Sequence, residues 1–411
     1  MKNFYLTFRG KMKAIFIYFF IYPATIFTIP LFMLLKIFFF NNKDLKFVLL
    51  DGHKIGHVAL CLEPFIKKLY EKRVQKKHNF TYLIFFIKPI ANKYYHKLIT
   101  DYLKKKKNIF VLKNYLFWIS FCKNFKLITK KNILIKGTPR QRFHKINNDN
   151  NVIIKIPEYG IKIGDELVKK LGIIKHNKWI CISNRDSKYL EKRFKNINSS
   201  YHNYRDFSIT SMKKAIEYFI SKNYYVVRIG SLMREKLNFE HEMFIDYPFS
   251  KFQSDFLDIY LSSKCCFYFG SGAGISNIPR LFRRPMFMIN QVPFKGVFLH
   301  KNKLQIFKKL RDKNSKKILS INDILEKELF AIPSSFEFKK KNVELINNTE
   351  DEILTFAKEA ILLHENKYKS FDQNITKNQK NMQVLLQKHD SFKNLFWTNK
   401  IGMDFLNNLN I

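Results

Sequence analysis

The sequence predicts an α/β protein in which parallel β-sheets are flanked by helices. Short apolar runs alternate with amphipathic segments from residue 46 onward, which is typical of strands that alternate with helices. The chain has 411 residues, of which 46% are hydrophobic and 16% aromatic, so it can bury a core and general disorder is excluded. A polar run at residues 147–151 separates two such stretches and predicts two α/β domains.

The first predicted domain spans residues 44–151. Its expected strands are the apolar runs at residues 47–50, 82–87, 109–112 and 133–135. The first of these strands is followed by a polar loop that contains Asp51, His53 and His57, and then by a helix that reaches Tyr70. Carboxylate and imidazole side chains are the usual general bases of enzymes, so this loop is a candidate catalytic segment.

The second predicted domain spans residues 152–340 and shows a clearer alternation. We expect strands at residues 178–182, 224–229, 244–246, 265–269 and 285–289, and helices at 161–171, 211–221, 254–261 and 275–282. The remaining region, residues 341–411, is expected to contain a terminal helix at 350–364 and then a helical tail. Thr349 and Glu352 have the spacing of a capping box, which fixes the start of that helix.

The amino-terminal residues 1–43 form a predicted membrane anchor or re-entrant segment. Residues 14–35 are 22 consecutive residues without a charge, long enough to span a bilayer. Pro23 and Pro30 interrupt the run and would kink a helix. Lysines and arginines flank it on both sides, which favours cytoplasmic ends and an anionic inner-membrane surface. A single span, a monotopic insertion and a buried core helix all remain open.

The net charge of +41 suggests nucleic acid as a first partner. Arg supplies only 13 of the 74 basic residues, however, and the excess of Lys accompanies the Asn, Ile, Phe and Tyr that A/T-rich codons favour. Eight of the arginines lie between Arg185 and Arg284. Because Arg binds phosphate in a planar, bidentate manner, this stretch is where we expect anion binding.

Candidate binding residues follow the predicted strands of the second domain, where ligands of open α/β sheets bind. Asn184 and Arg185 follow the first strand, Arg228 ends the second, and Asp246 ends the third. A turn of small residues, the glycine turn, follows the fourth strand. It comprises Gly270, Ser271, Gly272, Ala273, Gly274 and, two residues on, Ser276. Its amides would open a helix whose amino terminus attracts anions. Together these groups predict a site for a nucleotide diphosphate.

Other common sites are absent from the sequence. The GSGAG turn lacks the third glycine of GxGxxG, which argues against a nicotinamide cofactor, and GxxxxGK[ST] does not occur. We find no HExxH motif, no cysteine–histidine cluster and no DxD motif in an obvious loop. We therefore expect neither a cofactor nor a metal.

Several spaced motifs resemble a bacterial family of glycosyltransferases associated with surface polysaccharides. They include residues 160–190, Tyr204-Arg205-Asp206, residues 224–230, residues 245–247, residues 254–290 and the closing Asn347-Asn348-Thr349-Glu350-Asp351-Glu352-Ile353. Residues 51–57 resemble the early loop of the family, and the resemblance covers residues 46–365. A more distant similarity is to fucosyltransferases with an HxR motif, in which Arg185 matches the arginine whereas Ser183 and Asn184 stand in place of His-x.

The resemblance implies a GT-B fold with two facing Rossmann-like domains. It implies an enzyme that uses a nucleotide-sugar donor and a glycan or lipid-linked acceptor, and from the apolar amino terminus we expect this enzyme on the cytoplasmic side of the inner membrane. Arg185 and the glycine turn would then stabilise the departing diphosphate, which requires no divalent ion. His57, with Asp51, is the expected base. A nucleic-acid-binding protein and a non-catalytic membrane-tethered scaffold remain as alternatives.

Overall fold

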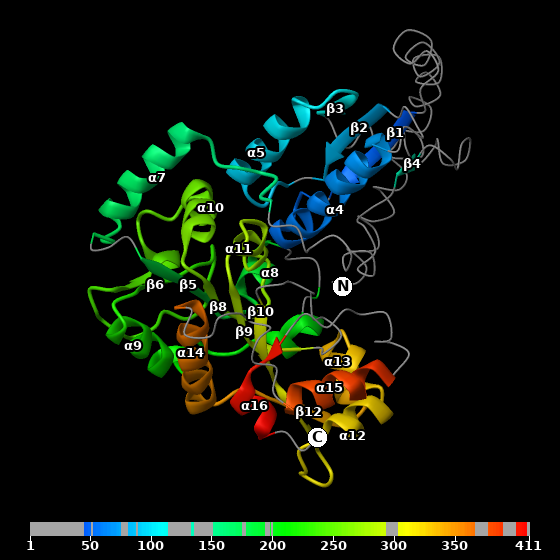
Figure 1. The fold of residues 1–411 in the computed structure, drawn as a ribbon, viewed down its shortest axis with the longest axis vertical. Helices are drawn as coiled ribbons and strands as arrows, with labels where there is room; N and C mark the ends of the chain where they lie inside the picture. The colour runs from blue at the N-terminus through cyan, green and yellow to red at the C-terminus, as the bar shows by residue number, and fades with distance from the viewer. Residues whose placement is uncertain are drawn as a thin grey trace, which may run out of the picture. The chain divides into compact units, whose positions relative to one another are not determined.

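The chain divides into two compact units, Met1–Pro139 and Arg140–Ile411, in a computed structural model (Figure 1). The structure describes residues 45–50, 52–74, 81–87, 89–113, 133–134, 151–174, 178–193, 198, 200–292, 303–365, 377–388 and 400–408. The predicted membrane segment at residues 1–43 lies outside these ranges. Among the helices described, none has the length and apolar character needed to cross a bilayer.

Unit 1 contains a four-stranded parallel sheet with the strand order β3-β2-β1-β4. The strands are β1 (Leu45–Leu50), β2 (Thr81–Phe86), β3 (Ile109–Val111) and β4 (Ile133–Leu134). The helices α4 (Ile55–Val74) and α5 (Lys93–Lys104) connect the first three strands, and the side chain of Asn92 caps α5 by accepting from the amide of Tyr95 at 2.7 Å. The predicted parallel α/β arrangement of this half is confirmed.

Unit 2 is built on a seven-stranded sheet with the order β13-β10-β9-β8-β5-β6-β7, and every pair in it is parallel. The strands are β5 (Trp179–Ser183), β6 (Tyr225–Arg228), β7 (Phe244–Asp246), β8 (Tyr268–Gly270), β9 (Met286–Gln291), β10 (Lys303–Phe307) and β13 (Lys400–Ile401). The chain adds strands outward from β5 and then restarts beside it with β8. This reversal of strand order is a topological switch point, where a crevice forms at the carboxyl ends of the strands.

Helices cover both faces of this sheet because its side chains alternate between two apolar environments. On one face, Phe219 of α9 (Lys213–Ser221) packs edge-on against Phe269, which in turn contacts Phe356 of α14 (Glu350–His364). On the other face, Trp179 and Cys181 donate to the carbonyl of Leu261 in α10 (Asp255–Lys264). The helices α7 (Glu158–Lys170) and α11 (Asn277–Leu281) pack against α10 (Figure 1).

Residues after 290 are more regular than the sequence indicated. They form β10, an antiparallel pair of β11 (Lys309–Asp312) with β12 (Val343–Ile346), and the short helices α12 (Ile321–Glu326) and α13 (Ser335–Lys340). The terminal helix α14 has the predicted bounds and the predicted capping box. The tail contains helices α15 (Lys377–Lys388) and α16 (Met403–Asn407), but between them β13 joins the main sheet beside β10.

Two predicted elements have different bounds, for a local reason. The strand predicted at residues 265–269 begins only at Tyr268, because α10 continues three residues beyond its expected end at Leu261 and Cys265 caps it. The helix predicted at residues 275–282 is the five-residue α11, because residues 271–276 remain in the loop that leaves β8.

The packing of α7 on α10 leads to a stability prediction. A Cβ atom at Gly164 of α7 would lie 2.2 Å from the ring of Tyr260, which is buried and donates to Asp165 at 2.6 Å. The ring cannot move aside, so Gly164→Ala should lower the free energy of unfolding by about 1–3 kcal/mol in a thermal or denaturant melt. Glu166→Ala, on the exposed side of the same helix, should change it by less than about 0.5 kcal/mol. Equal effects of the two variants would contradict this packing.

Candidate functional site

The predicted donor residues of the second half meet at one edge of the unit 2 sheet. Asn184 and Arg185 follow β5, Arg228 ends β6, Asp246 ends β7 and Gly270 ends β8. The sheet pairs Ser183 with Gly270, so the glycine turn lies beside the residues that follow β5. This is the switch-point edge, where a ligand is expected in an open α/β sheet.

Arg228 forms a buried brace between the strand ends. Its side chain is fully buried and donates to both carboxylate oxygens of Asp246 at 3.2 Å, to the carbonyl of Glu235 at 2.7 Å and to Oδ1 of Asn184 at 3.0 Å. Asn184 in turn donates to the carbonyl of Phe207 at 3.0 Å. Burial lowers the pKa of Arg228, although the charge of Asp246 opposes this. These contacts bind the predicted residues Asn184, Arg228 and Asp246 to one another, and a donor-binding role for the three remains a prediction.

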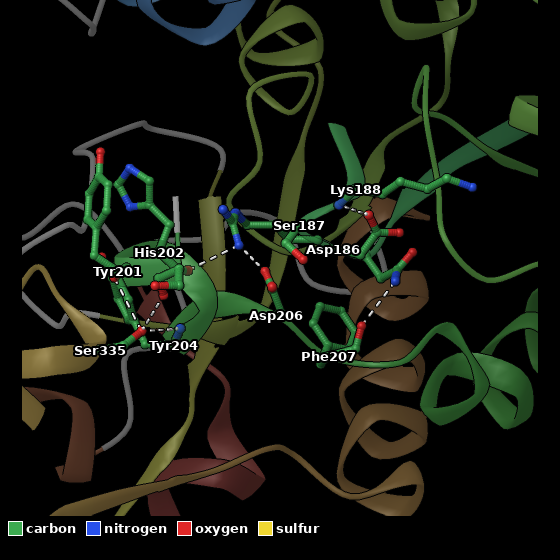
Figure 2. A network of polar contacts seen from close by, with 12 residues as sticks. Asp186, Ser187, Lys188, Tyr201, His202, Tyr204, Asp206, Phe207 and Ser335 are labelled. Carbon is green, nitrogen blue, oxygen red and sulfur yellow. Dashed lines mark hydrogen bonds and ion pairs between the residues drawn. The ribbon is translucent and has the colours of Figure 1, made fainter. Parts of the chain in front are cut away.

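Arg185 belongs to a second group, the cation cluster, which comprises Arg185, Lys308 and Arg205. Arg185 and Lys308 contact Asp206, and the charge of Arg205 acts on both. Arg185 forms an ion pair with the carboxylate of Asp206 and donates to the carbonyl of His202 at 3.1 Å. Lys308, which follows β10, donates from Nζ to the backbone carbonyl of Asp206 at 2.9 Å. Figure 2 shows Asp206 and His202 facing the residues that follow β5. Asp206 therefore contacts two of these cations, and the charge of the third, Arg205, acts on both of them.

Arg185 and Lys308 are both nearly buried, with 7% and 3% of their surface exposed. Burial, together with the charge of Arg205, lowers the pKa of Arg185 to about 9. Burial, and then the charges of Arg185 and Arg205, lowers the pKa of Lys308 to about 7. Both shifts mean that the site disfavours its own positive charge. An anion placed there would reverse this effect, because an opposite charge within a few ångströms favours the charged form.

The segment that precedes Asp206 is held in place by hydrogen bonds to Ser335. Residues Ser200–Arg205 form the 3₁₀ helix η3, and Ser335 at the start of α13 secures it. The hydroxyl of Ser335 accepts from the amide of Tyr204 at 3.0 Å and donates to the carbonyl of Ser200 at 3.2 Å (Figure 2). The cation cluster is thus assembled from β5 and η3, which are near each other in the sequence, and from Lys308 after β10, which is 102 residues beyond Asp206.

The glycine turn is pressed against the end of β5. Gly270 has a φ of +157°, and a Cβ atom there would lie 2.2 Å from the carbonyl oxygen of Ser183. The amide of Ser271 donates to that same carbonyl at 3.0 Å. A residue with a side chain at position 270 would force the turn away from β5, so glycine is required for this close approach.

The turn presents backbone donors rather than a helix terminus. Within the described residues, the amides of Gly272, Gly274, Ile275 and Ser276 make no hydrogen bond, and neither does the buried hydroxyl of Ser271. Ser276 uses its hydroxyl to donate to the carbonyl of Ala273 at 2.7 Å. The helix α11 has only five residues, so the expected helix amino terminus is too short to be the anion-binding element. Successive unpaired amides in a turn nevertheless form a concave anion-binding surface.

The predicted catalytic residues belong to unit 1. His57 is exposed in the first turn of α4, where its amide donates to the carbonyl of Lys54 at 2.9 Å. Asp51 lies outside the described residues. The assignment of both residues as the general base therefore remains a prediction.

Sequence reasoning missed Lys308 and the role of Asp206. Lys308 lies in a Lys-rich stretch that composition alone could explain, yet it directly follows an apolar run, which is a strand-end position like that of Arg185. That signal could have found it. Asp206 follows no strand, and nothing in its neighbourhood in the sequence predicts its contact with Arg185. Among the described residues, no group of three His, Cys, Asp or Glu side chains is arranged to hold a metal.

Comparisons with known proteins give structural neighbours only. No family model matches the sequence, and no curated protein matches it. The structure is similar to a glycosyl transferase family 9 protein from Veillonella parvula DSM 2008, with 11% identity and a TM-score of 0.45 over 78% of this chain and 97% of that chain.

A further neighbour is the iron-containing dodecameric glycosyltransferase TibC from enterotoxigenic E. coli H10407. The identity is 13% and the TM-score 0.31, over 62% of this chain and 60% of that one. The heptosyltransferase TibC in complex with ADP-D-beta-D-heptose gives 12% and 0.31, over 64% and 62% of the two chains. These neighbours are glycosyltransferases, the class that the sequence resemblance named. At these TM-scores the similarity decides neither activity nor ligand.

The lowered pKa of Lys308 leads to a prediction about the ligand-free protein. The folded state binds this proton less tightly than the unfolded chain, so the Lys308 charge destabilises the fold below pH 7, and the effect fades as the pH rises from 7 toward the ordinary lysine pKa. Lys308→Met removes this contribution. Its stability relative to the wild type should therefore be greater at pH 6 than at pH 8.5, by about 2 kcal/mol in denaturant melts. A difference between the two proteins that does not change with pH would contradict the burial of this charge.

Proposed function

We propose that the chain is a glycosyltransferase that transfers a sugar from a nucleotide-activated donor to a cell-surface glycan or lipid-linked acceptor. The observation that carries this proposal is the cation cluster beside an amide-lined turn at the switch-point edge of the sheet. Both contacts of Arg185 in the described residues use Nη1, which leaves Nε and Nη2 as donors for a ligand. A diphosphate has the charge and the number of acceptor oxygens to satisfy the cations and the amides together.

The chemistry follows from where negative charge develops. As the acceptor oxygen bonds to the anomeric carbon, the bond from that carbon to the diphosphate oxygen breaks, and the electron pair leaves with the nucleoside diphosphate. Arg185, Lys308 and the amides of Gly272, Gly274, Ile275 and Ser276 would stabilise the charge that grows on the leaving group. In this proposal the protein's own cations do so without a divalent ion. The acceptor's proton goes to a general base, for which we propose His57, with Asp51 as its partner.

The place of action is also part of the proposal. The apolar residues 14–35 and the lysines and arginines on both sides of them support attachment to the cytoplasmic face of the inner membrane. A lipid-linked acceptor would be available at that surface.

Binding of nucleotides tests the proposed site directly. At least one of UDP, GDP, CMP and their sugars should raise the melting temperature of the wild-type protein. Arg185→Lys should weaken binding of that nucleotide by about tenfold in calorimetry. One hydrogen bond to a charged group contributes about 1.5–3 kcal/mol, and lysine lacks the planar guanidinium group that donates two such bonds in parallel.

Arg284→Lys is the matched control. Arg284 donates from Nε to the carbonyl of Ser263 at 2.7 Å and lies two residues before the start of β9, at the opposite end of the strands. Its replacement should leave nucleotide affinity within about twofold, within the usual precision of such comparisons. If no nucleotide raises the melting temperature, the result would favour a non-catalytic membrane-tethered scaffold. Steeply salt-dependent binding of nucleic acid would favour a nucleic-acid-binding protein. Equal affinity of Arg185→Lys and wild type would show that the diphosphate binds elsewhere.

A further inference from the structure

The closing motif of the sequence is joined to the site by two buried asparagines. Asn290 near the end of β9 and Asn348 just before α14 are each 2% exposed. The amide of Asn290 donates to Oδ1 of Asn348 at 2.7 Å, and the amide of Asn348 donates to Oδ1 of Asn290 at 2.7 Å. We call this reciprocal pair the asparagine latch. It fixes the start of α14 to the carboxyl end of the sheet.

The asparagine latch lies at an irregularity in the sheet. Between β9 and β10 the register shifts, so that Gln305 pairs with Met288 and Phe307 pairs with Gln291. Between these two pairs, β9 contributes two residues, Ile289 and Asn290, where β10 contributes only Ile306. Asn290, which belongs to this irregular stretch, has a φ of +52°. An irregularity of this kind redirects the side chains that follow it.

The latch reaches Lys308 through one peptide group. Asn348 donates from Nδ2 to the carbonyl oxygen of Phe307 at 2.8 Å. The other end of the same peptide, the amide of Lys308, donates to the carbonyl of Gln291 at 3.1 Å. The peptide that joins Phe307 to Lys308 is therefore held at both ends. This fixes the direction in which the Lys308 side chain leaves the backbone, toward the carbonyl of Asp206.

We propose that Asn348 is a positioning residue that presents the Lys308 ammonium group to the diphosphate of the donor. The identity of the ligand in this inference rests on the proposed function. The hydrogen bonds that link Asn348 to Lys308 through the Phe307–Lys308 peptide do not depend on that function. Asn348 touches no reacting atom. It acts through the Phe307–Lys308 peptide, so removal of its side chain should matter only while Lys308 is present.

Two double-mutant cycles test this role. In calorimetry with the nucleoside diphosphate or nucleotide-sugar that the wild type binds, Asn348→Ala and Lys308→Met should each weaken binding by about tenfold, as expected for one charge-assisted contact. The double variant should be no weaker than Lys308→Met alone, because residues in one network are not additive. In the absence of ligand, Asn348→Ala should also remove most of the pH-dependent stability difference between wild type and Lys308→Met.

Thr349→Ala is the matched control. It removes the capping box of α14, in which Thr349 accepts from the amide of Glu352 at 3.2 Å, while leaving the contact of Asn348 with Phe307 in place. It should lower stability but keep affinity within about twofold. Should Asn348→Ala not fold, Asn290→Gly opens the latch from its other side, because glycine tolerates the positive φ at that position.

The outcomes separate this inference from the proposed function. If the wild type binds no nucleotide, the proposed function fails, and the ligand-free pH cycle still decides the positioning role. If nucleotide binds but the losses from Asn348→Ala and Lys308→Met add, Asn348 acts by general stability and the inference is wrong. Persistence of the full pH-dependent difference in the Asn348→Ala background would overturn it as well.

Discussion

Burial of Arg185 and Lys308 around Asp206, near the charge of Arg205, is the interaction on which the site of unit 2 depends. Arg185 and Lys308 have almost no contact with water, and they share Asp206, which provides a carboxylate to one and a backbone carbonyl to the other. Their lost hydration is only partly replaced, because burial and the charge of Arg205 still lower the pKa values of both groups. Such an excess of buried charge is retained where a ligand supplies the missing counter-charge, and sites with strongly shifted pKa values are for that reason often functional.

The architecture explains how these groups reach one place. The order of strands reverses between β5 and β8, so the residues that follow these two strands border a common crevice. Gly270 permits the turn after β8 to touch the end of β5, and the fully buried Arg228 holds the ends of β5, β6 and β7 together. On the far side, the irregular pairing of β9 with β10 and the asparagine latch direct Lys308 toward η3. Each of these contacts fixes the end of a strand, and Arg185 and Lys308 follow two of these strand ends.

Much of this arrangement could be predicted from local patterns. The apolar runs predicted β1 to β4 of unit 1 and β5 to β9 of unit 2, but not the strands after residue 300. Thr349 and Glu352 predicted the start of α14, and strand-end positions indicated Arg185 and the glycine turn. Lys308 was missed, and Asp206 was noticed only as part of a motif, because their contact joins residues that are 102 positions apart in the sequence. Asn348 was noticed only as part of a closing motif, because its contacts with Asn290 and Phe307 span 58 and 41 residues. Arg228 and Asp246 were predicted to bind the donor because they lie at strand ends. Residues that join neighbouring strands to one another occupy the same positions, so the sequence pattern does not distinguish the two roles.

Proton uptake on binding tests the central claim, that an anion neutralises the cation cluster. Calorimetric titration of the wild-type protein with a nucleoside diphosphate at pH 8, in buffers of different ionisation enthalpy, measures the protons taken up for each ligand bound. Because the pKa of Lys308 is about 7 without ligand and an adjacent diphosphate should raise it, the wild type should take up a large fraction of one proton. Lys308→Met should take up almost none. Equal proton uptake by the two proteins, or none by the wild type, would contradict the account.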